Sequence, residues 1–352
     1  MIRKVIYAII FGLTIFFVIR NYDELVIIIH TLGRAEPGWL LAAVGAQVLW
    51  IIAIAGNLQS TYRLTGMRET LRRMIVLTAA GNFINVVAPS YGAGAMAVFI
   101  ADGQQRDKPA GKITTASFLY LVYDYLGFMI VLSIGIVLMN ARRLLGTAII
   151  GASIFAGTIG VALIIAAVVG IFSSQHLDRL VVWFVRGINR LARPFIKKQL
   201  IDLENARGFG ADLASGLIKI RRSPGNLLQP IGWALGRKTM MIVILYFVSR
   251  AYSSPFDLPT VFVSFTVSYL FTIASVTPSG VGFVEGAMSL IQVSMGIDPA
   301  TSVAIAVAYR GLTFWLILLY GFFAIRAVDY QPKDQQKKSD TSDETRLHSG
   351  KE

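Results

Sequence analysis

Three charged residues lie inside long apolar segments, and they are the strongest candidates for chemistry in this sequence. Asp124 follows Tyr123 in one segment, Glu285 follows a glycine-rich turn, and Arg310 interrupts a run of Val, Ala and Leu residues. A charge in the lipid core costs about 2.5 kcal/mol or more on insertion scales, so such a residue lines a polar cavity or pairs with an opposite charge. Both roles are open for these three residues at this point.

Arg237 and Lys238 also fall within an apolar segment, at residues 225–249. We expect these two residues to begin a span close to the membrane interface. Long basic side chains can extend their charged ends to water from such a position. In that position Arg237 and Lys238 would anchor the helix at the interface and would not belong to a buried site.

Signals for other chemistry are weak. The chain has no cysteine, which excludes disulfides and thiolate metal sites. Its three histidines are scattered among predicted loops and the tail: His30, His176 and His348. No pattern of nucleophile, histidine and carboxylate is visible, so we expect no enzymatic activity, no metal and no cofactor.

Two segments rich in Pro, Gly and polar residues break otherwise apolar blocks, at 81–94 and 277–286. Pro removes a backbone donor and Gly permits unusual φ values, so each segment is expected to turn the chain back at membrane depth. Half-helix ends at such a turn direct partial charges at a ligand, and positive N-termini suit phosphate. Alternatively, the polar side chains only satisfy backbone groups that the turn exposes. The candidate substrate-binding residues are Asn82, Asn85, Pro89, Ser90, Gly92, Asp124, Pro278, Ser279, Gly280, Gly282, Glu285 and Arg310.

Membrane-spanning helices are the elements that must position these residues. Of the 352 residues, 55% are hydrophobic and 15% are charged, whereas a soluble domain carries about 25% charged residues. The apolar blocks approach the ~20 residues that a helix needs to cross the lipid core, where open backbone cannot be satisfied. We predict an all-α polytopic membrane protein with about six full spans and two re-entrant hairpins. The predicted full spans are 5–19, 38–56, 113–140, 144–172, 225–249 and 301–325, and the predicted hairpins are 74–101 and 260–296.

The formal net charge of +13 fits a membrane topology better than nucleic-acid binding. If both hairpins return to the side that they entered from, 25 of the 33 Lys and Arg residues lie on the side of the N-terminus and 5 lie opposite. Treating residues 74–101 as a full span would place ten basic residues of the segment 173–224 outside, against the positive-inside rule. We predict cytoplasmic termini and no nucleic-acid partner.

The hairpins also define a candidate inverted repeat, because each is preceded and followed by a span and they enter from opposite sides. Broken helices at corresponding positions of inverted halves indicate a transporter's substrate site. The expected divisions are an N-terminal membrane half at 1–172, a cytoplasmic amphipathic connector at 173–224, a C-terminal membrane half at 225–326 and a disordered tail at 327–352. The connector either links the halves or senses anionic lipid.

Three motifs resemble the membrane region of the lysylphosphatidylglycerol synthase/flippase family, which includes the multiple peptide resistance factor. They are Gly81-Asn82-Phe83-Ile84-Asn85 leading to Pro89-Ser90 and Gly92, Pro278-Ser279-Gly280-Val281-Gly282-Phe283-Val284-Glu285-Gly286, and Ala308-Tyr309-Arg310-Gly311-Leu312-Thr313-Phe314-Trp315. Where the family often has a Glu-Arg pair after the first motif, this chain has Tyr123-Asp124-Tyr125, so we do not expect that ion pair here.

The resemblance implies a membrane domain that moves a lipid between leaflets of the plasma membrane. The expected partners are membrane lipids, either an anionic or aminoacylated phospholipid or a glycolipid, and a homo-oligomer is left open. In full-length members a cytosolic synthase domain follows this membrane region, whereas a short polar tail follows it here, so synthase activity is not expected. The alternative is a lipid-binding scaffold or regulatory subunit that transports nothing.

Overall fold

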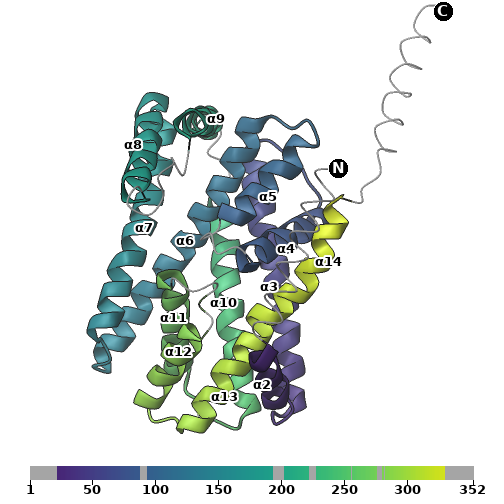
Figure 1. Ribbon diagram of the computed structural model, residues 1–352, viewed down its shortest axis with the longest axis vertical. Helices are drawn as coiled ribbons and strands as arrows, with labels where there is room; N and C mark the ends of the chain where they lie inside the picture. Colours follow the sequence, from purple (N-terminus) through teal and green to yellow (C-terminus); the bar gives the residue numbers. More distant parts are fainter. Residues whose placement is uncertain are drawn as a thin grey trace, which may run out of the picture.

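The computed structural model describes residues 22–87, 93–192, 202–221, 227–254, 256–275, 280 and 282–329. Within these ranges the chain forms helices and no strands, in one elongated bundle (Figure 1), which confirms the predicted all-α fold. The helices are α2 (Tyr22–Leu32), α3 (Pro37–Leu64), α4 (Leu71–Val87), α5 (Ala93–Gln104), α6 (Ala110–Ala141), α7 (Thr147–Phe172), α8 (Ser174–Ala192), α9 (Leu203–Arg221), α10 (Leu228–Ala251), α11 (Leu258–Ala274), α12 (Phe283–Ser294), α13 (Pro299–Arg310), the π-helical turn η2 (Gly311–Trp315) and α14 (Leu316–Asp329).

Five helical segments in the described part of the chain are long and apolar enough to cross a membrane: Pro37–Leu64, Gly111–Ala141, Thr147–Phe172, Leu228–Ala251 and Pro299–Ala327. Each overlaps a predicted span, whereas the predicted span 5–19 lies outside the described residues. Apolar side chains remain exposed along these helices, such as Ile154 at 65% and Val161 at 54% on α7. This is the surface expected of a multi-pass membrane protein, whose outer side chains face lipid rather than water.

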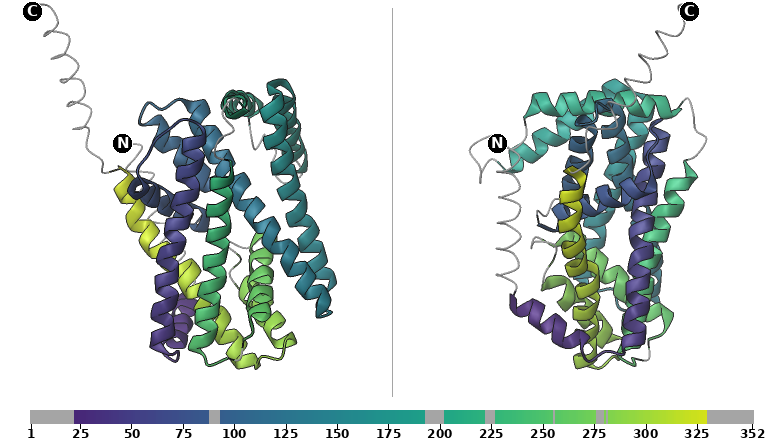
Figure 2. Two further views of the ribbon diagram at one scale, coloured as in Figure 1. Left: turned by 180° about the vertical axis from the view of Figure 1, so that it is seen from behind. Right: turned by 90° about the vertical axis from the view of Figure 1, so that its right-hand side faces the viewer.

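The helices α3 and α10 pack closely against each other and run antiparallel along most of their length (Figure 2). Gly56 of α3 allows the contact, because a Cβ atom there would lie 2.5 Å from the indole ring of Trp233 on α10. At the other end of the pair, the rings of Trp39 and Phe247 lie 5.8 Å apart. A glycine at the crossing therefore lets a large aromatic side chain fill the space between the two helices.

The first interrupted segment forms a hairpin of α4 and α5, which pack against each other. Arg73 near the start of α4 forms an ion pair with Asp102 near the end of α5. Lys108 after α5 forms a second ion pair, with Glu69 before α4. The chain therefore returns to the end of the molecule from which it entered, as predicted for the segment 74–101.

The second interrupted segment forms a similar hairpin of α11 and α12. Arg142, just after α6, holds its two ends together by donating to Asp257 at 2.7 Å and lying 3.9 Å from the sulfur of Met295. Asp257 begins α11 and Met295 ends α12. The predicted segment 260–296 thus also leaves and returns at one end.

The two hairpins open toward opposite ends of the bundle. The open end of the first lies beside the start of α6, and the open end of the second lies beside Arg142 after the end of α6. The far ends of α4 and α11, at Asn85 and Ser275, both line one cavity, so these two helix ends approach each other inside the bundle. This is the arrangement that the inverted repeat requires, while the depth of the hairpins in a membrane stays a prediction.

The connector forms two helices, α8 and α9, that pack against each other at one end of the molecule (Figure 1). In α8, Leu177 and Val185 are buried whereas Arg179, Arg186 and Arg190 are exposed, which is the pattern of an amphipathic helix. Thr115 of α6 donates to the backbone of Leu213 in α9 at 3.1 Å and fixes the connector to the bundle.

Two histidines were wrongly expected in loops. His30 lies in α2, a helix that the sequence analysis did not predict, and His176 lies in α8. The end of α2 is held against the end of α10, where the Tyr252 hydroxyl donates to the carbonyl of Thr31 at 2.8 Å.

Candidate functional site

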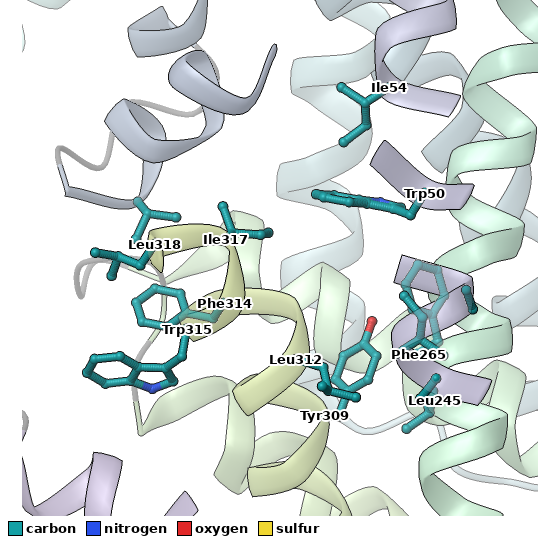
Figure 3. Close-up of a cluster of buried hydrophobic side chains, with 14 of the residues drawn as sticks. Trp50, Ile54, Leu245, Phe265, Tyr309, Leu312, Phe314, Trp315, Ile317 and Leu318 are labelled. Atoms are coloured by element: carbon teal, nitrogen blue, oxygen red, sulfur yellow. The ribbon is translucent and has the colours of Figure 1, made fainter. Parts of the chain in front are cut away.

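A partly open cavity of about 250 Å³ lies beside the ends of α4 and α11, one helix from each hairpin. The first hairpin contributes Asn82 and Asn85 from the end of α4, and the second contributes Thr272 and Ser275 from the end of α11. Side chains of α3, α6, α10 and α13 to α14 complete its wall, and several of them belong to the apolar cluster in Figure 3: Trp50, Phe265, Tyr309, Phe314 and Ile317. The cavity therefore has apolar walls and a few polar groups, the composition of a ligand site.

Asp124 on α6 is the centre of a buried charge cluster. Its Oδ1 lies 2.9 Å from Nη1 of Arg237 and 2.7 Å from Nζ of Lys238, both on α10. The hydroxyl of Tyr269 on α11 donates to its Oδ2 at 3.3 Å. Two helices, α10 and α11, thus supply groups to one carboxylate on α6.

Aromatic rings enclose the two cations of this cluster. Arg237 lies 5.8 Å from the ring centre of Trp50 and donates to the Tyr120 hydroxyl at 3.3 Å. Lys238 lies 3.9 Å above the ring of Tyr269. Ring faces carry negative partial charge, so they stabilise the two cations.

Arg310 at the end of α13 forms a second buried pair. Its Nε donates to Oε1 of Glu285 on α12 at 2.6 Å, and its guanidinium lies 4.5 Å from the ring centre of Phe314. Only 7% of Arg310 is exposed, and it lines the cavity. Of the two carboxylates that the sequence analysis singled out inside apolar segments, Asp124 and Glu285, Glu285 is the one that pairs with Arg310.

A π-helical turn, Gly311–Trp315, follows Arg310 directly. Such turns insert an extra residue into a helix and occur often at functional sites. Gly311 faces α2, where an added Cβ would lie 2.8 Å from Ile28. The turn therefore changes the direction of side chains beyond Arg310, and nothing in the apolar pattern of residues 301–325 indicated it.

The predicted site residues divide into three groups. Asn82, Asn85, Asp124 and Arg310 line the cavity, and Glu285 contacts it through Arg310. Gly280 and Gly282 have φ values of +74° and +78°, so they supply the turn between α11 and α12. Five residues lie outside the described part of the chain: Pro89, Ser90, Gly92, Pro278 and Ser279.

Asn85 also has the structural role that was left open, because its side-chain oxygen accepts from the backbone N–H of Ala95 in α5 at 3.0 Å. It thus satisfies a donor at the start of a helix that has no partner within that helix. Asn85 can make this bond and still contact a ligand in the cavity, because the NH₂ group of its side chain can donate further hydrogen bonds.

The expectation for Arg237 and Lys238 was wrong. Lys238 is fully buried and Arg237 is 11% exposed, and both pair with Asp124 instead of reaching the membrane interface. Nine residues of helix precede Arg237 in α10, a distance of about 14 Å at 1.5 Å per residue. The requirement that Asp124 have a buried cation could have identified them.

These features define a multi-pass α-helical membrane protein in which two oppositely opened hairpins enclose a charged internal cavity. A family model of the lysylphosphatidylglycerol synthase transmembrane region matches residues 5–321, and the chain belongs to this family. A UPF0104 membrane protein of Methanothermobacter thermautotrophicus is 23% identical over 309 residues, which are 84% of this chain and 86% of the relative.

Proposed function

We propose that this protein moves a phospholipid or lipid-linked molecule between the leaflets of its membrane, with the headgroup passing through the cavity. One observation carries the proposal: the ends of α4 and α11 line the same cavity, and these helices belong to two hairpins that open toward opposite ends of the bundle. A headgroup that enters beside one hairpin can then leave beside the other. Membership of a family with flippase-like members supports the same function.

The paired charges suit this task because they provide polar contacts without leaving an isolated ion in the apolar interior. A headgroup in the lipid core would lose its water, and the free-energy cost of that loss limits spontaneous movement between leaflets. Asp124, Arg237 and Arg310 can replace part of that hydration. The acyl chains need no polar path, because they can stay in the lipid core beside the exposed apolar side chains of the bundle while the headgroup crosses.

The test is transport in vesicles that contain the purified protein and a trace of phospholipid with a fluorescent label on one acyl chain. A reductant added outside quenches only the outer leaflet, so the rate of further quenching reports movement. We expect movement above that in protein-free vesicles. Thr272→Trp should abolish it, because an indole at this position fills the cavity that Thr272 lines.

Leu290→Trp is the matched control, since Leu290 is 73% exposed on α12 and adds the same ring outside the cavity. Both variants should elute as folded protein in detergent. Movement by Thr272→Trp at the wild-type rate would exclude the cavity as the path. Lipid binding without any movement would favour the alternative of a lipid-binding scaffold.

A further inference from the structure

The five charges at the cavity do not cancel, and their sum indicates which headgroups fit. We infer that the cavity selects headgroups with a net charge of −1, that Arg237 is their first contact, and that cationic headgroups such as aminoacylated ones are rejected. The inference rests on the proposed function, since it assumes that a headgroup enters this cavity.

Among the described residues, the charge clusters at the cavity contain three cations and two carboxylates. The positive charge of Arg310 is balanced by the negative charge of Glu285. Arg237 and Lys238 share the single carboxylate of Asp124. With Lys238 protonated, the site carries one unmatched positive charge, which lies at the Asp124 cluster rather than at Arg310.

Arg237 is the member of the cluster that faces the ligand space. It lines the cavity, whereas Lys238 has 0% exposure and is not part of the wall. The Nε–H of Arg237 is buried without a hydrogen-bond partner, while its Nη1 is used by Asp124 and Tyr120. A phosphate in the cavity would contact the exposed part of the Arg237 guanidinium rather than this buried Nε, and Lys238 supplies the second charge from behind.

A cationic headgroup finds no comparable partner. The Asp124 carboxylate already contacts two cations and a hydroxyl, and Glu285, which holds Arg310, does not line the cavity. An ammonium group would meet a like charge at Arg237 in a site of low dielectric, where repulsion is stronger than in water. A phosphodiester without an amine matches the single surplus charge.

The experiment compares three lipids with identical labelled acyl chains in the vesicle assay: phosphatidylglycerol at −1, phosphatidylcholine at 0 and lysylphosphatidylglycerol at +1. We expect the anionic lipid to move at least tenfold faster than the cationic one. Binding of short-chain forms of the same lipids to the detergent-solubilised protein should follow the same order. Arg250→Gln on the same helix is the control, because Arg250 lies outside the cavity wall and stacks on Trp39.

Variants that change the charge of the site test whether its net charge, rather than one particular contact, determines the preference for anionic lipid. Lys238→Met makes the site neutral and should remove the preference between the anionic and zwitterionic lipids. The double variant Asp124→Asn/Lys238→Met leaves Arg237 unmatched, returns the net charge to +1, and should restore the preference. If Lys238→Met fails to fold, the double variant still decides, since loss of the preference there overturns the inference.

The two hypotheses fail in different ways. If no lipid moves, the proposed transport is wrong, while the binding measurement still tests the charge preference. If all three lipids move or bind equally, transport or binding stands and the charge inference is overturned. A cationic lipid that moves fastest would also overturn it.

Discussion

At the scale of single residues, the site is determined by which buried charge finds which partner. A buried ion is costly, so the sequence alone required that Asp124, Glu285 and Arg310 find opposite charges. The structure meets this requirement with two separate clusters on different helices. The assignment of Glu285 to Arg310 was predictable as one of two choices, whereas the partners of Asp124 were not, because Arg237 and Lys238 were placed at an interface.

The Arg310–Glu285 pair gives a prediction that separates its structural role from its transport role. Arg310→Gln leaves Glu285 buried without its cation, which should lower the free energy of unfolding by about 3–5 kcal/mol. The double variant Glu285→Gln/Arg310→Gln removes both charges and should recover most of that stability. Thermal unfolding in detergent measures both effects.

Lipid movement should not recover in the double variant, because the guanidinium that lines the cavity is still missing. Arg310→Lys should move lipid at a reduced rate, since a lysine cannot reproduce the planar fork that grips a phosphate at two points. If the double variant moves lipid at the wild-type rate, Arg310 serves only the fold.

At the scale of helices, the hydrophobic blocks allowed the long apolar helices to be predicted, since length and apolar composition govern insertion. Two elements could not be predicted this way. The short helix α2 depends on contacts with the ends of α10 and α13, and the π-turn after Arg310 leaves no mark in the apolar pattern. Both are decided by tertiary packing, which overrides local preference.

The contact between α3 and α10 makes a second prediction. Gly56→Leu places a side chain where the indole of Trp233 now lies, and overpacking of this kind costs about 1–3 kcal/mol. We expect a lower unfolding temperature in detergent. Gly45→Leu on the same helix is the control, because nothing lies within 4 Å of a Cβ at Gly45. Equal effects of the two variants would contradict the close contact.

The open end of the second hairpin makes a third prediction, which concerns pH. Hydrogen bonds from Thr260, and the guanidinium of Arg142, hold the pKa of Asp257 below its usual value. A lowered pKa means that Asp257 stabilises the fold at neutral pH and loses this contribution as the pH falls below the value of an unfolded aspartate, about 3.9. Asp257→Ala should therefore destabilise the protein at pH 7 and have less effect at pH 3.

Loss of the N-cap alone costs about 1 kcal/mol. Asp298→Ala is the matched control, since it removes an equivalent cap from α13 and leaves the contact of Arg142 with Asp257 in place. Thermal unfolding of both variants is measured at pH 7 and at pH 3. We expect the difference between the two pH values to be larger for Asp257→Ala than for Asp298→Ala. Equal differences would contradict the role assigned to Arg142.

At the scale of the whole molecule, the predicted topology and the structure agree on which segments share an end. The ion pairs of Arg73 and Lys108 join two basic segments, and the basic connector packs on the start of α6 beside them. The segments around Arg142, Asp257 and Met295 gather at the other end. The positive-inside rule, applied to every loop at once, groups the same segments at one end from the positions of Lys and Arg in the sequence alone.

Single cysteines test this arrangement in a membrane, since the chain has no native thiol. Arg68→Cys and Gln105→Cys lie at the exposed open end of the first hairpin, and Leu258→Cys and Ala300→Cys lie exposed at the other end of the bundle. We expect an impermeant maleimide to label the first two only from the cytoplasmic side and the last two only from outside. Labelling of positions 68 and 105 from opposite sides would mean that α4 and α5 together cross the membrane. The cavity would then no longer lie between two hairpins that open to opposite sides, and the proposed path for the headgroup would have to be abandoned.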